Sequence, residues 1–258
     1  MSRPSSPSSL RHSQAGFTLV EMSIVLVIIG VILGAVMIGR DTQKNAEYLR
    51  IKQTFVNQWA VSYNSFVQRY GYPIGDRMDA PRLMINGSNY AGALGGDLSS
   101  VAEPPSLCGP TAPTGSAMAR APQPAQDANG TAAHLLELLG RSGLELPRGR
   151  GTGLEDRYAY LDSNGNPQEL QICFQWNRPG SPHGAGNVMV ISGLTPDLAR
   201  NLDNSLDGVL NASSGSFRLQ GVTANTTDWG ANNAQNLSGG ATRDGQVTTL
   251  TAYYRMNQ

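Results

Sequence analysis

The sequence predicts an α+β protein in which a long N-terminal helix is packed on a globular head with an antiparallel β-sheet. Two features predict the helix: an apolar run at residues 17–39 and an amphipathic stretch at residues 40–70. The head, residues 71–258, contains short strand-like segments and a hairpin signal. Glycine (30) and proline (15) make up about 17% of the chain, against a usual level of about 12%. This content favours a loop-rich head over a helical bundle.

The composition argues against several classes of protein. Lys and Arg (19) balance Asp and Glu (19), so the formal net charge is zero and no nucleic-acid partner is expected. Two cysteines are too few for a disulfide-dense scaffold or for a zinc cluster built on cysteines. The sequence holds three histidines and lacks HExxH, CxxC, GxxxxGK[ST], GxSxG and SxxK motifs. We therefore expect neither an enzyme nor a cofactor.

Residues 17–39 form the membrane-spanning half of the predicted helix. These 23 residues carry one charged side chain, Glu21, and a helix of this length crosses a bilayer at about 1.5 Å per residue. Arg3 and Arg11 precede the run and orient the N-terminus towards the cytoplasm. The run is too long for an ordinary secretory signal and lacks a small-residue cleavage site after it. A single-pass anchor is therefore predicted.

Glu21 stands out within this span. A carboxylate inside an apolar span costs about 2.5–3.5 kcal/mol on insertion scales, so it normally has a partner or a function. The span contains no Lys or Arg, and the nearest candidate cation is the amine that a cut before Phe17 would create. A rigid helix cannot fold its own terminus back over four residues. A neighbouring subunit shifted along a filament axis would supply that amine instead.

Residues 16–21, Gly-Phe-Thr-Leu-Val-Glu, and the apolar run after them resemble the class III signal of type IV pilins and type II secretion pseudopilins. The resemblance implies that residues 1–16 are a leader peptide, that a prepilin peptidase cuts after Gly16, and that Phe17 becomes the N-methylated terminus. It also implies that Glu21 pairs with the amine of an adjacent subunit. The implied partners are other pilins of a homo- or hetero-oligomeric filament, the prepilin peptidase and an inner-membrane assembly platform.

The function implied by this resemblance is structural: a pilin-like subunit of a type IV pilus-like filament. The chain would sit in the inner membrane with a periplasmic head before assembly, and in an extracellular pilus or a periplasmic pseudopilus afterwards. Two alternatives stay open, a pseudopilin of a type II secretion system and a minor pilin with an adhesin or DNA-uptake role. The near-neutral charge does not favour DNA, but Arg148, Arg150 and Arg157 are candidates for a local basic patch. An anchored enzyme is the weakest alternative.

The helix is predicted to continue beyond the span as an amphipathic helix that ends near Gly71 and Pro73. Apolar side chains recur at three- and four-residue steps, among them Leu49, Phe55, Val56, Trp59, Ala60, Tyr63, Phe66, Val67 and Tyr70. We interpret the aromatic ones as core between helix and head. Within the span, Gly30 and Gly34 have a spacing that lets helices approach closely, although small residues also occur in membrane helices without that role.

Local signals predict the elements of the head. Strands are expected at residues 158–161, 169–176, 187–192, 217–222 and 247–254. The turn at residues 162–167 joins the first two strands in a hairpin. Two short helices are expected, at residues 131–140 and 195–206, and residues 99–130 are expected to have little regular structure. Residues 71–79 and patches up to about residue 220 resemble one large group of prepilin-type proteins.

Three further sets of residues are candidate sites. Cys108 and Cys173 are candidates for a disulfide once the head lies outside the cytoplasm, the alternative being two separate thiols. Asp203 and Asp207 share a helix face and are weak candidates for a cation site, capping and turn roles being the favoured interpretation. A calcium-like spacing also occurs in the turn, but a hairpin explains it better; its oxygen-bearing residues are Asp162, Asn164 and Asn166. Two histidines, His134 and His183, are too isolated to be ligands.

Overall fold

The computed structural model describes residues 17–107, 125–126, 132–133, 135–222, 228–230 and 247–256, with residues 40–41, 125–126 and 132–133 described by their backbone alone. The chain divides into two compact units, Met1–Ala46 and Glu47–Gln258. The predicted leader and residues 231–246 lie outside the described residues. The side chains buried in the core all belong to the second unit, in which Tyr48 is the first of them.

The N-terminal part of the chain is helical, as the sequence predicts. Helix α1 (Leu19–Ile51) is followed by a π-helical turn, η1 (Lys52–Val56), and by helix α2 (Asn57–Tyr70). Gly71 ends α2 in a left-handed conformation with φ 78°, and its N–H donates to the carbonyl oxygen of Val67 at 2.8 Å. The expected end of the helix is thereby confirmed. The predicted long helix is confirmed, and at η1 its backbone takes one wider turn that the sequence analysis does not address.

The described part of the head contains a five-stranded antiparallel sheet in the order β3–β4–β5–β7–β6. Its strands are β3 (Arg157–Leu161), β4 (Pro167–Asn177), β5 (Gly186–Leu194), β6 (Phe217–Leu219) and β7 (Leu250–Arg255). The first two form the predicted hairpin, in which Leu161 pairs with Pro167. The α+β fold class and the antiparallel sheet are therefore confirmed.

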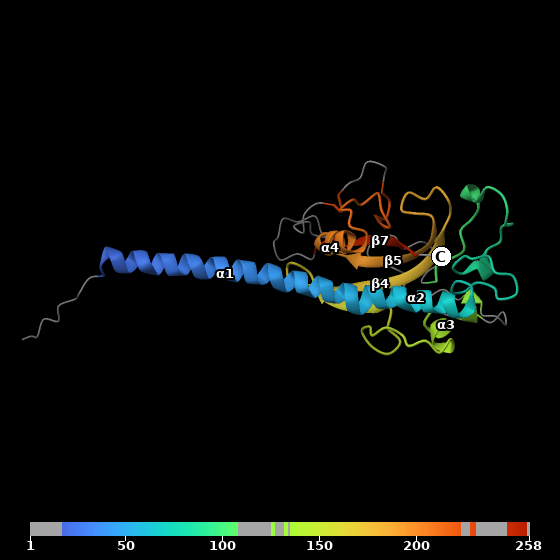
Figure 1. Cartoon of the computed structure of the whole chain (residues 1–258), viewed down its shortest axis with the longest axis horizontal. Helices are drawn as coiled ribbons and strands as arrows, with labels where there is room; N and C mark the ends of the chain where they lie inside the picture. Colours follow the sequence, from blue (N-terminus) through green and yellow to red (C-terminus); the bar gives the residue numbers. More distant parts are fainter. Residues whose placement is uncertain are drawn as a thin grey trace, which may run out of the picture. The chain divides into compact units, whose positions relative to one another are not determined.

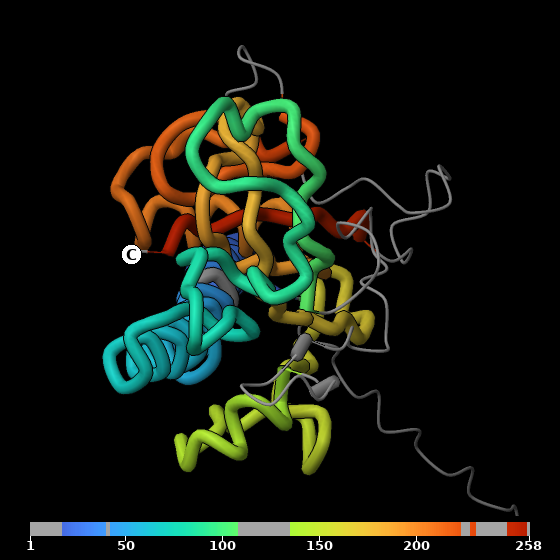
Figure 2. Tube along the Cα trace, turned by 90° about the vertical axis from the view of Figure 1, so that its right-hand side faces the viewer, coloured from blue at the N-terminus to red at the C-terminus, as the bar shows by residue number. Residues whose placement is uncertain are grey.

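Helix α2 packs on one face of this sheet (Figures 1 and 2). The cross-strand pairs place Phe174, Met189 and Tyr254 on the same face, because Phe174 pairs with Met189 and Met189 with Tyr254. The rings of Trp59 and Tyr63 lie 6.1 Å and 5.2 Å from the ring of Phe174. Both rings are fully buried, so this contact holds the helix on the sheet.

The aromatic run along α2 is core for most of its length. Trp59, Tyr63 and Phe66 are buried, which confirms their interpretation, whereas Tyr70 is 37% exposed. The Tyr70 ring contacts Phe66, and its hydroxyl donates to the carbonyl oxygen of Ser142 at 3.3 Å. Tyr70 thus lies at the edge of the core and not inside it.

A buried carboxylate organises the turn that follows α2. Asp76 is 2% exposed, and its two oxygens accept the backbone N–H groups of Arg77 at 2.8 Å and Arg82 at 2.9 Å. Gly87 passes so close that a Cβ on it would lie 2.4 Å from Asp76 Oδ1. Asp76 therefore fixes the loop that follows α2 through the backbone N–H groups that it accepts.

Several element boundaries in the head differ from the prediction. Helix α3 covers Leu135–Arg141 because residues 132–133 form a short strand, β2, that pairs with β1 (Ala125–Gln126). Helix α4 covers Pro196–Leu206 and begins with proline at its first position, as expected. Strand β6 ends three residues early and β7 starts three residues late. Short 3-10 turns at Gly87–Asn89 (η2) and Leu98–Ser100 (η3) complete the described elements.

Candidate functional site: the first turn of the N-terminal helix

The residues that the sequence singles out for function begin at the start of α1. Thr18 precedes the helix, and Glu21 lies in its first turn. The backbone N–H and the hydroxyl of Thr18 donate to Glu21 Oε2 at 2.8 Å and 2.9 Å. In return, the backbone N–H of Glu21 donates to Thr18 Oγ1 at 3.2 Å. This reciprocal arrangement is a capping box, which satisfies N–H groups that a helix start leaves without partners.

The site also includes Thr18, which the sequence analysis did not identify as a partner of Glu21. The sequence carries the signal for it, because threonine followed three residues later by glutamate before an apolar run marks a capping box. Both hydrogen bonds that the carboxylate accepts end on Oε2. Within the described part of the chain, Oε1 accepts no hydrogen bond, so it remains available to a donor from another molecule.

The apolar side chains around this turn are exposed in the single chain. Phe17 is 80% exposed, and the large apolar side chains from Val20 to Ile38 are 44–71% exposed. One helical stretch of the described chain, Leu19–Tyr70, is long and apolar enough to cross a membrane. Exposed apolar surface of this extent is unfavourable in water, so this segment is compatible with anchoring in the inner membrane.

The two glycines of the span have open surroundings. A Cβ added to Gly30 or Gly34 would meet nothing within 4 Å apart from the helix's own backbone. Within the described residues, neither glycine is needed for packing inside this chain. A role in contacts between helices of different chains stays a prediction.

Two predicted site residues lie outside the described residues: Gly16, the residue before the expected cut, and Cys108. Cys173 is fully buried in β4 and is disulfide-bonded. The chain has two cysteines, but the pairing of Cys173 with Cys108 stays a prediction because one partner is not described. His134 also lies outside the described residues.

Asp203 and Asp207 are brought together at the end of α4. Asp203 is fully buried, and its Oδ2 accepts the indole N–H of Trp229 at 2.7 Å and the backbone N–H of Asn211 at 2.9 Å. Asp207 accepts backbone N–H groups on both oxygens, from Val209, Ser216 and Phe217. Three of the four oxygens are thus committed to N–H donors. This is the geometry of a cap and a turn.

The environment of this pair affects the charge of Asp203. Burial, with the neighbouring Asp207 carboxylate adding to it, raises the pKa of Asp203 from 3.8 to about 6, although the hydrogen bond from Trp229 opposes the shift. No group of three or more His, Cys, Asp or Glu side chains that could hold a metal ion occurs among the described residues.

The calcium-like spacing in the β3–β4 turn serves the turn itself. Asp162 Oδ1 accepts the backbone N–H groups of Asn164 at 2.9 Å and Asn166 at 2.8 Å. Its Oδ2 accepts the backbone N–H of Val247 at 3.0 Å. These bonds tie the hairpin to the segment before β7, in agreement with the hairpin interpretation.

A single glutamate partly offsets the charge of the candidate basic patch. Arg150 and Arg157 both form ion pairs with Glu169, the second at 3.0 Å. Arg148 takes no part in these pairs. The ring of His183 packs against the ring of Tyr253 in a tilted arrangement, with 4.2 Å between ring centroids, and burial lowers the pKa of His183.

Comparison with known proteins agrees with the geometry of the helix start. A family model described as the prokaryotic N-terminal methylation motif matches residues 11–37. Searches of curated proteins and of solved structures found no match. The matched residues include the expected cleavage position, the capping box and most of the exposed apolar run. The chain therefore carries the prepilin-type cleavage and methylation signature of type IV pilins and pseudopilins.

Proposed function

We propose that this chain is the precursor of a structural subunit of a type IV pilus-like filament. The observation that carries the proposal is the methylation motif on an apolar helix whose side chains are exposed in the single chain. The motif implies processing by a prepilin peptidase and assembly with pilins. In the proposed sequence of events, the leader 1–16 is removed after Gly16 and Phe17 is N-methylated. Residues 17–39 then hold the chain in the inner membrane with a periplasmic head.

Assembly moves the apolar segment from lipid into the core of a filament. An assembly platform extracts the processed subunit from the membrane. The apolar segments of neighbouring subunits then contact one another instead of lipid. Glu21 is the assembly carboxylate in this proposal. Its Oε1 accepts the methylated amine of a neighbour's Phe17, while Oε2 keeps the capping contacts with Thr18. Pairing the two charges offsets the cost of leaving a carboxylate in an apolar core.

The role proposed is structural and not catalytic. A pseudopilin of a type II secretion system would carry the same N-terminal residues and differ in the compartment of the filament, which is periplasmic and not extracellular. A minor pilin with an adhesin or DNA-uptake role would differ in abundance and in what its head binds. For the DNA-uptake alternative, Glu169 offsets only part of the charge of Arg150 and Arg157, and the zero net charge of the chain does not favour DNA.

Processing is tested by co-expressing the full chain with and without a prepilin peptidase and measuring its intact mass in the membrane fraction. The proposal expects loss of residues 1–16 and gain of one methyl group only when the peptidase is present. Gly16→Val serves as the matched control, because a bulky side chain before the cut should leave the leader attached. An unchanged mass for the wild-type chain in the presence of an active peptidase would contradict the proposal.

A further inference from the structure

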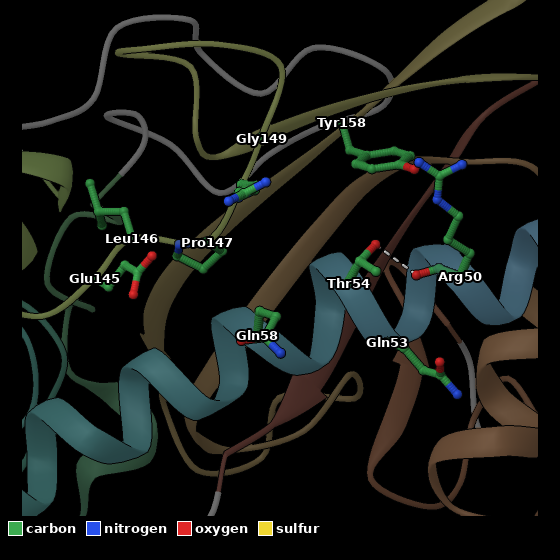
Figure 3. A pocket seen from close by; sticks show the side chains of 10 residues that line it. Arg50, Gln53, Thr54, Gln58, Glu145, Leu146, Pro147, Gly149 and Tyr158 are labelled. Carbon is green, nitrogen blue, oxygen red and sulfur yellow. Dashed lines mark hydrogen bonds between the residues drawn. The ribbon is translucent and has the colours of Figure 1, made fainter.

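The head contains a polar groove that the filament proposal does not use. The groove has a volume of about 560 Å³ and lies between the helical segment 50–58 and the loop 145–149 (Figure 3). Its lining includes Arg50, Thr54, Gln58, Glu145, Arg148 and Tyr158. Every one of these residues belongs to the unit Glu47–Gln258. The groove is thus a feature of the head itself.

The loop wall of the groove is fixed before any ligand arrives. Pro147 is buried, and Gly149 passes so close to the next turn that a Cβ on it would lie 2.4 Å from the carbonyl oxygen of Glu155. The backbone N–H of Arg150 donates to the carbonyl oxygens of Leu154 at 3.1 Å and Arg157 at 2.8 Å. A wall held in this way loses little conformational entropy on binding.

Two arginines give the groove its charge. Arg50 comes from the helix and Arg148 from the loop, and neither guanidinium forms an ion pair with a carboxylate in the described part of the chain. With Glu145 included, the lining carries a net charge of +1. A guanidinium fork matches the two oxygens of a carboxylate. The groove therefore suits a ligand with isolated carboxylates better than one with a charge on every unit.

The rest of the lining offers neutral hydrogen-bonding groups and one aromatic ring. Thr54 and Gln58 lie on the side of the helix that faces the loop (Figure 3). The hydroxyl of Thr54 donates to the carbonyl oxygen of Arg50 at 2.8 Å, so its oxygen is left as an acceptor. The Tyr158 ring packs on Phe55, with 5.3 Å between centroids, and the Arg50 side chain reaches towards its hydroxyl end. Amides, a hydroxyl and an aromatic ring suit a ligand rich in hydroxyl groups.

We propose that this groove binds an acidic oligosaccharide in which a carboxylate-bearing sugar alternates with a neutral one. Arg50 and Arg148 each offer a guanidinium to carboxylates of the ligand, Gln58 and Thr54 bond to hydroxyl groups, and Tyr158 contacts a sugar ring. Glu145 accepts hydroxyl donors and repels ligands with a dense run of negative charge. This binding goes beyond filament assembly and does not depend on it.

The test measures binding of a hyaluronan hexasaccharide, which alternates glucuronate with N-acetylglucosamine, to the full chain in detergent by titration calorimetry. We expect chitohexaose, which has the neutral sugar alone, to bind at least about tenfold more weakly, a difference of about 1.4 kcal/mol. Arg50→Gln combined with Arg148→Gln should cause a loss of similar size. Arg50→Lys combined with Arg148→Lys should lose part of the affinity, because lysine keeps the charge without the fork. Arg178→Gln, at an exposed arginine outside the groove, should bind as wild type does.

Four results would overturn the proposal. They are no binding of the hexasaccharide at millimolar concentration, equal binding by the double glutamine variant, tighter binding of a hexaglutamate peptide, and tighter binding of a heparin hexasaccharide. The third would identify an acidic-peptide surface and the fourth a general polyanion surface. Circular dichroism of the double variant checks its fold, which should be unchanged because both arginines are exposed.

Discussion

Two residues at the start of α1 show how a carboxylate is tolerated at the edge of an apolar helix. Thr18 and Glu21 form three hydrogen bonds with each other. The carboxylate therefore stabilises the start of the helix through the capping box. A negative charge in the first turn also interacts favourably with the helix dipole. In the single chain, the capping contacts stabilise the Glu21 carboxylate. In the filament, the proposed pairing with a neighbour's amine stabilises it. Substitution of Glu21 can separate these two roles.

Glu21→Gln keeps the capping box, because glutamine also serves in it, but removes the charge. Glu21→Ala removes both. If the charge drives assembly, both variants should insert into the membrane and be cleaved, yet enter sheared filaments at least about tenfold less than wild type, equivalent to about 1.4 kcal/mol. Quantitative immunoblots of the sheared and membrane fractions measure this ratio, with Ser23→Ala as the control. Wild-type incorporation of Glu21→Gln would show that the cap, and not the charge, is what assembly requires.

Asp203 gives the head a pH dependence with a defined sign. Its pKa is raised from 3.8 to about 6 in the folded chain, chiefly by burial, so folding favours the protonated form. The resulting stability is fully present below pH 3.8 and is lost as the pH rises through about 6. Each pKa unit corresponds to about 1.4 kcal/mol.

Asp203→Asn tests this dependence, because an amide resembles the protonated acid at every pH. Urea unfolding of the full chain in detergent should show that wild type loses more than about 1 kcal/mol relative to the variant between pH 4 and pH 7.5. The difference between the two curves isolates this residue from other titrating groups. Parallel curves would show that Asp203 titrates alike in the folded and unfolded chains.

At the scale of elements, the sequence predicts those helices, strands and turns that depend on residue periodicity and on turn residues. The helix end at Gly71, the β3–β4 hairpin and the proline at the start of α4 each follow from local signals that the structure confirms. The π turn η1 and the short β1–β2 pair carry no such signal. The groove was not predicted either, because residues 50–58 and 145–149 meet only through the tertiary fold.

Gly193 shows how a single backbone position shapes an element. It lies in β5 at a register shift between Ser192 and Leu194, with φ 81°, and a Cβ there would lie 2.0 Å from the carbonyl oxygen of Glu169. The carbonyl oxygen of Gly193 also accepts the hydroxyl of Tyr160 at 2.7 Å. The residue is therefore fixed by both its conformation and its neighbours.

Gly193→Ala should destabilise the head far more than Gly180→Ala. Gly180 has a similar φ of 86°, but nothing lies within 4 Å of a Cβ placed on it. The Gly180 variant should therefore lose only the cost of the left-handed backbone, about 1–2 kcal/mol. We expect the Gly193 variant to lose at least about 2 kcal/mol more in urea unfolding, the range of overpacking, or not to fold. Equal losses would show that the strand shifts to admit the methyl group.

At the scale of the whole molecule, the two units differ in how they bury apolar surface. The unit Glu47–Gln258 contains the buried core, whereas no described side chain of Met1–Ala46 is buried. The first unit therefore depends on lipid or on other chains for its apolar surroundings. The sequence predicts this dependence, because the apolar run and Glu21 are local features. It does not predict the compartment of the filament, which is decided by partners outside this chain.

The most direct test of the central claim is N-terminal peptide mass spectrometry of filaments sheared from the native cells. We expect an abundant peptide that begins at Phe17 and carries one methyl group on its terminal amine. Processed protein found in the membrane fraction alone would point to a minor pilin or a pseudopilin. A chain that still begins within residues 1–16 would contradict the account and leave a plain membrane-anchored domain.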